Sequence, residues 1–214
     1  MIILFKEVEI NEKKLIQLIK DLIRIPSFVK GIDYGCEKDI AEFLAKRLKE
    51  AGFKVFLQEV MKDRPNVIGI LQGKGNGYSL MLNGHLDTVE VNKMKINPFS
   101  GEVKNGRIYG RGAADMKGAL AAMIIASEAI KELNFELKGD LIISGCVDEE
   151  GKGIGGKYLA ESGLKADMAI VGEPTGLKLG IAHKGLTFID IIAKGKAIHG
   201  SCPKLGKTLN INYE

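Results

Sequence analysis

Apolar residues in the first fifty positions recur with the period of an α-helix. The spacing i, i+3, i+4, i+7, i+8 is met by Leu15, Leu18, Ile19, Leu22 and Ile23. Pro26 follows this stripe and limits the helix, because proline disrupts a helix interior. A second stripe consists of Ile40, Phe43, Leu44 and Leu48. Gly52 stands where a helix end favours a left-handed backbone, so we predict two amphipathic helices with one buried face each.

Short apolar runs with the length of strands follow the two helices. They read FKVFLQEV (53–60), NVIGIL (66–71), SLMLNG (79–84), DLIISGCV (140–147) and DMAIVG (167–172). Residues 117–133, rich in Ala, Met and Ile, and residues 154–162 favour further helices. Strands that alternate with helices predict an α/β fold with a mostly parallel sheet and helices on both faces.

The turn GKGNG (73–77) joins two of the predicted strands. A phosphate-binding loop would lead into a helix, whereas this turn leads into a strand. We therefore predict that it connects a β-hairpin.

The pattern changes near residue 183. LTFIDIIAKGKAIHG (186–200) alternates apolar and polar positions, as a half-exposed antiparallel strand does. We predict one α/β domain over residues 1–182 and the beginning of a small α+β domain over residues 183–214. About thirty residues are too few for an independent core, so the chain is expected to stop inside its second domain.

Composition and charge narrow the class of protein. The 214 residues carry a net charge of +4 from 31 basic and 27 acidic side chains, with no basic block and no Trp. This disfavours a nucleic-acid partner. No apolar run approaches the roughly 20 residues of a membrane span, and the start MIILFKEVEI lacks a basic leader and a cleavage site. Three distant cysteines favour a reducing, cytoplasmic setting.

The segment NGHLDTVEV (83–91) places a histidine and an aspartate two residues apart at the end of a predicted strand. Side chains at i and i+2 of an extended chain point the same way. His85 and Asp87 are therefore expected to reach one point beyond the carboxyl end of the strand, where open α/β sheets place their ligands.

Further acidic residues follow the other predicted strands or precede the buried helix. They are Asp115, Asp148, Glu149, Glu150 and Glu173. Each could be a solvated loop charge, but parallel strands bring their carboxyl ends to one edge, where these groups would repel one another without cations. One imidazole among carboxylates suits zinc, with cobalt or manganese as alternatives. Two metal ions bridged by one aspartate would use the carboxylates efficiently.

Several motifs together resemble one family. They are NGHLDTV, GRGAADMKGALAAMI, DEEG, GEPT, and HKG followed by HGS-x-P. In this order the motifs resemble the co-catalytic zinc amidohydrolases and peptidases, which include acetylornithine deacetylase, succinyl-diaminopimelate desuccinylase, aminoacylase and carboxypeptidase G. The resemblance implies a zinc-exopeptidase-like domain, a lid domain through which the parent enzyme dimerises, and hydrolysis of the amide bond of N-acyl amino acids or small peptides.

The resemblance also implies a role for each site residue. His85 and Glu173 would hold one zinc ion, Glu150 would belong to the second, and Asp115 would bridge the two. Asp87 would orient and polarise His85, as carboxylates commonly do for zinc-bound imidazoles. Glu149 would act as general base, and His199 of the lid domain would stabilise the oxyanion in the partner subunit. A cis peptide bond is implied after Asp115.

The chain departs from the family pattern in one respect that bears on activity. The family's second zinc has a histidine ligand near the end of a longer chain, and the three histidines of this sequence do not supply it. The resemblance thus implies that the catalytic domain over residues 1–182 is incomplete and lacks its carboxyl-terminal part. An alternative is therefore a truncated, inactive homologue that only binds metal. A second alternative is a dinucleotide-binding oxidoreductase, because GKGIGG (151–156) fits G-x-G-x-x-G between a strand and a helix. The acidic residues 148–150 disfavour a pyrophosphate there.

Overall fold

The computed structural model describes residues 8–30, 34–92, 94–185, 187, 189, 199 and 201. By its internal contacts the chain divides into two compact units, residues 1–177 and 178–214. Every helix and strand of the described residues lies in the first unit. The strand predicted from LTFIDIIAKGKAIHG lies largely outside the described residues, so a separate domain from residue 183 stays a prediction.

The predicted helical stripes form helices close to the expected bounds. The helices of the described residues are α1 (Glu12–Arg24), α2 (Lys38–Glu50), α3 (Lys117–Glu132) and α4 (Ile154–Glu161). Asn11 caps α1, because its side chain accepts a hydrogen bond from the amide of Lys14. Gly52 follows α2 with a φ of 84°, and the amide of Phe53 donates back to the carbonyl of Leu48. Among the described residues, no helix combines the length and the apolar composition that crossing a membrane requires.

A mixed sheet forms the centre of the first unit. Its strands are β3 (Lys54–Met61), β4 (Arg64–Leu71), β5 (Leu80–His85), β8 (Leu141–Cys146) and β9 (Met168–Val171), in the order β3-β4-β8-β5-β9. Among these described strands only β4 runs in the opposite direction. Two short antiparallel pairs lie outside the sheet, β1 (Val29–Lys30) with β2 (Tyr34–Gly35) and β6 (Glu102–Lys104) with β7 (Arg107–Tyr109). The predicted α/β fold with a mostly parallel sheet is confirmed.

The carboxyl ends of β8, β5 and β9 meet at one edge of this sheet, called the carboxyl edge below. His85, the last residue of β5, pairs with Cys146 at the end of β8. Because β4 is reversed, its amino end comes to the same edge, where Val67 pairs with Gly145. Arg64, the first residue of β4, is thereby brought to the carboxyl edge.

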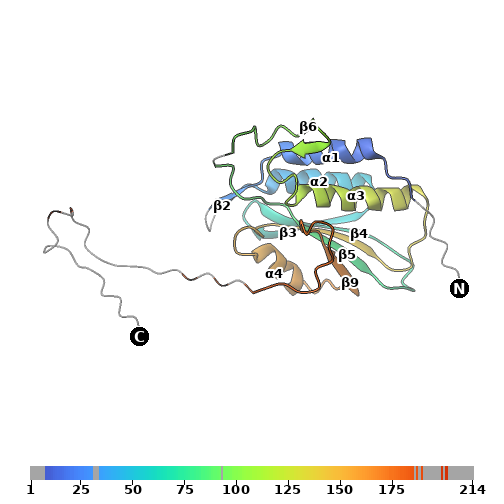
Figure 1. Cartoon of the computed structure of the whole chain (residues 1–214). Helices are drawn as coiled ribbons and strands as arrows, with labels where there is room; N and C mark the ends of the chain where they lie inside the picture. The colour runs from blue at the N-terminus through green and yellow to red at the C-terminus, as the bar shows by residue number, and fades with distance from the viewer. Residues whose placement is uncertain are drawn as a thin grey trace. The chain divides into compact units, whose positions relative to one another are not determined.

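Helices cover both faces of the sheet (Figure 1). α2 and α3 contact one face and α1 packs on α3, whereas α4 contacts the opposite face. The core of the first face includes Leu44, Val67 and Leu120, and the core of the second includes Ile68 and Ile142. Val67 and Ile68 are neighbours in β4, so their side chains enter different cores, as the two-residue period of a strand requires.

The turn GKGNG does not form the predicted hairpin, because β8 lies between β4 and β5. Residues 72–79 pass instead over the segment that leads into β8, where the amide of Lys74 donates to the carbonyl of Leu137. A Cβ at Gly73 would overlap the backbone of Gly139, so this crossing needs glycine. The hairpin prediction was wrong because an apolar strand can pair with more than one neighbour, and the local sequence does not say which.

Gly139→Ala is expected to lower the free energy of unfolding by about 1–3 kcal/mol. The added methyl group would overlap the backbone of Gly77 and Tyr78, so one of the two crossing segments would have to move. Gly156→Ala in α4 is the control, since no atom lies within 4 Å of the position that its methyl group would take and a helix favours alanine by about 0.5–1 kcal/mol. Urea unfolding measures both variants, and an unchanged midpoint for Gly139→Ala would contradict the crossing.

Candidate metal centre

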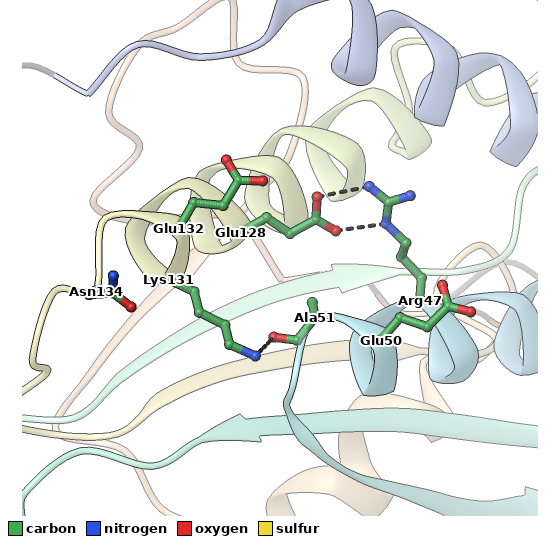
Figure 2. Close-up of a pocket in the computed structure, with 7 residues that line it drawn as sticks. All are labelled: Arg47, Glu50, Ala51, Glu128, Lys131, Glu132 and Asn134. Atoms are coloured by element: carbon green, nitrogen blue, oxygen red, sulfur yellow. Dashed lines mark hydrogen bonds and ion pairs between the residues drawn. The ribbon is translucent and has the colours of Figure 1, made fainter.

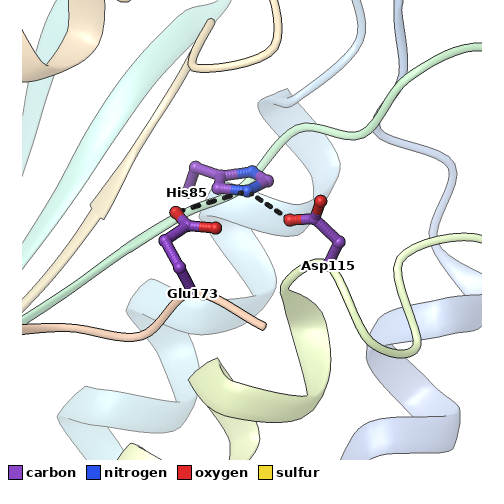
Figure 3. Close-up of side chains that lie close together, drawn as sticks. All are labelled: His85, Asp115 and Glu173. Atoms are coloured by element: carbon purple, nitrogen blue, oxygen red, sulfur yellow. Dashed lines mark hydrogen bonds and ion pairs between the residues drawn. The ribbon is translucent and has the colours of Figure 1, made fainter. Parts of the chain in front are cut away.

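His85 lies at the centre of a cluster of carboxylates at the carboxyl edge (Figure 3). Its side chain is 2% exposed, and its Nε2 atom is 3.0 Å from Oδ1 of Asp115. Oε1 of Glu173 and Oε2 of Glu149 each lie 3.9 Å from the same nitrogen. One ligand atom from each of His85, Asp115 and Glu173 can be chosen so that all three lie within 4.8 Å of one another. Such a group is compact enough to surround one metal ion.

Three separate segments deliver these side chains. His85 ends β5, Asp115 precedes α3, and Glu173 follows β9 by two residues. The bond between Asp115 and Met116 is cis, as the resemblance implied. Met116 is fully buried, and a Cβ at Gly84 would overlap its side chain. The glycine before His85 therefore lets the segment that carries Asp115 pack closely against β5.

The start of α3 is also tied to the end of α1. Lys117 is 1% exposed, and its Nζ atom donates to the carbonyls of Leu22 at 2.9 Å and Ile25 at 2.7 Å. These carbonyls lie at the end of α1, where the regular helical hydrogen bonds run out, although that of Leu22 also accepts from the amide of Ile25 at 3.3 Å. Burial lowers the pKa of Lys117 to about 7. This buried contact fixes the residue two positions after Asp115.

Asp87 makes two kinds of contact. Its backbone contacts His85, and its carboxylate contacts the turn after β8. Nδ1 of His85 lies 2.9 Å from the backbone carbonyl oxygen of Asp87 and 3.6 Å from its Oδ1. The two carboxylate oxygens accept hydrogen bonds from the amides of Glu149 at 3.1 Å and Glu150 at 2.9 Å. A proton on Nδ1 directed at the carbonyl leaves the lone pair of Nε2 facing Asp115 and Glu173, which is the tautomer that metal binding requires.

The electrostatics of the cluster favour a bound cation. Burial alone would lower the pKa of His85, but the hydrogen bond and charge of Asp87, with contributions from Asp115 and Glu149, raise it to about 9. Burial and the charge of neighbouring carboxylates raise the pKa of Glu150. The pKa of Glu173 is raised for the same two reasons. A divalent ion would relieve this repulsion, as protons do in its absence.

The predicted site residues fall into two groups. His85, Asp115, Glu149 and Glu173 come together, and Asp87 lies against His85. Glu150 joins this group through its amide, which donates to Asp87, and its carboxyl group interacts electrostatically with Asp115 and His85. His199 belongs to the second unit, where it is exposed and its Nδ1 lies 2.9 Å from Oγ of Ser201.

Two buried charged residues at the carboxyl edge were missed by sequence reasoning. Glu37 precedes α2, and Arg64 begins β4. In the sequence both stand next to other charged residues, and such charged stretches usually lie on the solvent-exposed surface. The one signal was an arginine at the head of the strand-like run RPNVIGIL.

The first backbone amides of the glycine-rich segment GKGIGG form hydrogen bonds within the loop after β8. The amides of Gly151 and Gly153 donate to the backbone carbonyl of Asp148, and the amide of Lys152 donates to its carboxylate. A pyrophosphate would need these amides and would meet the carboxylate of Asp148. The dinucleotide-binding alternative is therefore not favoured.

A cavity of about 410 Å³ lies apart from this cluster (Figure 2). It is lined by Arg47, Glu50, Ala51, Glu128, Lys131, Glu132 and Asn134. Nε and Nη2 of Arg47 donate to the two carboxylate oxygens of Glu128 at 2.6 and 2.8 Å, and Nζ of Lys131 donates to the carbonyl of Ala51. These contacts join α2 to α3, and none of the predicted site residues takes part.

Comparison with known proteins identifies the family. Residues 81–208 match Peptidase family M20/M25/M40, and the chain belongs to this family. It is 36% identical over 179 residues to N-formyl-4-amino-5-aminomethyl-2-methylpyrimidine deformylase of Bacillus subtilis, a match that covers 81% of this chain and 42% of that protein. It is also 36% identical over 198 residues to succinyl-diaminopimelate desuccinylase of Wigglesworthia glossinidia brevipalpis, covering 86% of this chain and 50% of that protein.

Solved structures agree with this assignment. A tripeptidase of Staphylococcus aureus superposes with a TM-score of 0.64 at 27% identity, covering 92% of this chain and 53% of that chain. An M20 family metallo-carboxypeptidase of Sulfolobus solfataricus gives a TM-score of 0.62 at 27% identity, covering 74% of this chain and 37% of that chain. The chain spans about half the length of the curated relatives that it matches.

Proposed function

We propose that the full-length protein is a metal-dependent hydrolase that cleaves the amide bond of N-acyl amino acids or small peptides. The observation that carries this proposal is the cluster of His85, Asp115 and Glu173 in a member of Peptidase family M20/M25/M40. The names of the relatives (a deformylase, a desuccinylase and a tripeptidase) support the substrate class, since each describes removal of an acyl group or cleavage of a peptide.

The residues of the cluster fit zinc, with cobalt or manganese as alternatives. One neutral imidazole and several carboxylates form a donor set that these ions accept. His85 and Glu173 would hold one ion, Asp115 would bridge to a second, and Glu150 would serve that second ion. Zinc bound there would lower the pKa of a water molecule and polarise the amide carbonyl.

Glu149 is the proposed proton carrier. Its side chain is 54% exposed, and its carboxylate lies 3.9 Å from Nε2 of His85, so it faces the place where substrate and water would meet. It would take a proton from the attacking water and pass it to the leaving amine. Asp87 would hold the ring of His85 in the required tautomer and keep Glu149 in place through its amide.

The resemblance also supports proposals for the rest of the protein. Residues from about 183 would begin the lid domain, the full-length enzyme would form a homodimer through it, and His199 would reach the partner's active site to bind the oxyanion. We also propose a reducing compartment such as the cytoplasm, because the three cysteines lie far apart in the sequence.

A direct test combines metal content with hydrolysis. Full-length protein is loaded with zinc, cobalt or manganese and given N-succinyl, N-acetyl and N-formyl amino acids and a tripeptide, and the free amine released is measured. We expect hydrolysis of at least one substrate, loss of activity with a chelator and recovery on adding metal. Activity that survives complete removal of metal, or stoichiometric metal without hydrolysis of any substrate, would contradict the proposal.

Metal binding by the 214-residue chain is expected to depend on pH. The pKa of His85 is raised to about 9 in the metal-free chain, so its ring is protonated at neutral pH and must lose that proton when a metal binds. The affinity for Zn²⁺ should therefore fall about tenfold for each pH unit below 9. Calorimetric titrations from pH 6 to 9 in two buffers of different ionisation enthalpy would detect the released proton. An affinity that is flat over this range would contradict the raised pKa.

A further inference from the structure

A buried network of three charged side chains lies at the carboxyl edge beside the candidate metal centre. The side chains of Arg64, Glu37 and Asp148 are 4%, 0% and 2% exposed. Nε and Nη2 of Arg64 donate to the two oxygens of Glu37 at 2.8 and 2.5 Å, and Nη2 also donates to Oδ1 of Asp148 at 2.8 Å. One guanidinium thus joins the residue before α2 to the turn after β8.

Asp148 is held in an uncommon backbone conformation by this network. Its φ is 62°, in the left-handed region that residues other than glycine rarely adopt. Its Oδ1 accepts from Arg64, its Oδ2 accepts from the amide of Lys152 at 3.0 Å, and its own amide donates to Glu37 at 3.3 Å. Both carboxylate oxygens and the backbone amide of Asp148 therefore have hydrogen-bond partners. These bonds fix the direction in which the chain leaves β8.

The two residues that follow Asp148 are Glu149 and Glu150. Their amides donate to Asp87, so the turn is held from a second side by a fully buried carboxylate. Arg64 fixes the beginning of the turn, and Asp87 fixes its next two residues. Arg64 donates to the side chain of Asp148 and Asp87 accepts from two backbone amides, so together they fix the course of the turn that carries Glu149 and Glu150.

Stability alone is a poor account of this network. Three charges out of water carry a large desolvation cost, and replacing a buried ion network by apolar residues is often neutral or stabilising. What a planar guanidinium adds is direction, because its donors form a rigid fork that a lysine does not reproduce.

We propose that Arg64 is a positioning residue of the metal centre, which acts through Asp148 to fix the turn carrying Glu149 and Glu150. The functional part of this inference rests on the proposed roles of those two glutamates. Arg64 itself touches neither metal nor substrate, and it exerts its effect through the geometry of the turn.

The test compares Arg64→Lys with Arg47→Lys in the 214-residue chain. Lysine keeps the positive charge in both variants but cannot bridge Glu37 and Asp148 as the fork does. Arg47 is a matched control, because it also donates through Nε and Nη2 to one carboxylate, that of Glu128 in α3 (Figure 2). The side chain of Arg47 is 32% exposed, whereas that of Arg64 is 4% exposed, so the two arginines are not matched in burial. A second variant, Asp148→Asn, is therefore measured as well, because asparagine has nearly the same shape as aspartate and tolerates a left-handed backbone.

Two readouts are measured for each variant. Hydrogen exchange at the amides of Glu149 and Glu150 should speed up about tenfold or more in Arg64→Lys and, to a smaller extent, in Asp148→Asn, while amides in β5 change less. The Kd for Co²⁺ should rise about 10–100-fold in Arg64→Lys, with a change in the visible absorption of the bound ion. Arg47→Lys should leave both readouts within about twofold of the wild type.

The outcomes separate this inference from the proposed function. Unchanged exchange at Glu149 and Glu150 in both Arg64→Lys and Asp148→Asn would overturn the positioning role, as would acceleration by the same factor throughout the first unit. An unchanged Kd for Co²⁺ in Arg64→Lys would overturn the link to the metal centre. A wild-type chain that binds no Co²⁺ would contradict the metal centre proposed for His85, Asp115 and Glu173, and the exchange comparison would still decide whether Arg64 holds the turn.

Discussion

Replacing Glu149 with glutamine in the full-length protein is expected to lower kcat for amide hydrolysis by about 10²–10⁴-fold. The amide side chain keeps the size of the carboxylate but cannot accept a proton from water or return one to the leaving amine. Because the same group would serve both steps, the loss should lie toward the upper end of this range. The backbone amide that donates to Asp87 is unchanged by the substitution, so the turn should keep its place.

Metal content distinguishes a lost proton carrier from a lost site. Glu149→Gln should bind the same amount of zinc as the wild type by elemental analysis, with KM changed much less than kcat. Glu161→Gln, an exposed glutamate in α4, is the control and should leave both values unchanged. Near-normal turnover of Glu149→Gln with its metal bound would show that another group moves the proton.

His85→Ala is expected to weaken zinc binding by the 214-residue chain by at least about a hundredfold. Loss of a residue that merely supports a ligand already costs about 10–100-fold, and His85 supplies the only nitrogen in the cluster of described residues that could hold a metal. Calorimetry or competition with a chromophoric chelator measures the change. His183→Ala is the control, because that histidine is exposed and lies outside the cluster.

The His85 substitution also tests which residues hold the metal. Retention of wild-type affinity by His85→Ala would mean that the binding site is elsewhere on the chain. A loss of affinity in His183→Ala of the same size would point to the second unit.

Local periodicity was enough to predict the helices and most strands. The stripes ending at Ile23 and Leu48 became α1 and α2, since burial of one helical face depends on neighbours three and four residues apart. The partner of each strand depends on residues far away in the sequence. The run NVIGIL fits beside either β5 or β8, and the pattern alone assigned it to the wrong neighbour.

The dependence on residues far away in the sequence also determined which part of the site could be predicted. The proximity of His85, Asp115 and Glu173 could be predicted from the sequence. Each lies next to the end of a strand or the start of a helix, and in a parallel sheet these ends meet at one edge. Arg64 reaches this edge, where it meets Glu37, only because β4 is reversed, and no local pattern gives the direction of that strand. The carboxylate of Asp87 likewise finds its partners in a turn about sixty residues away.

The position of Glu173 after the edge strand β9 has a consequence for biosynthesis. A ribosome adds roughly 5–20 residues each second, so His85 leaves the ribosome several seconds before the last member of the cluster is made. During that interval the nascent chain holds an imidazole and an aspartate without their third partner. On the proposed function, high-affinity metal capture awaits the emergence of Glu173 after β9, and metal loading would report that all three members of the cluster have been made.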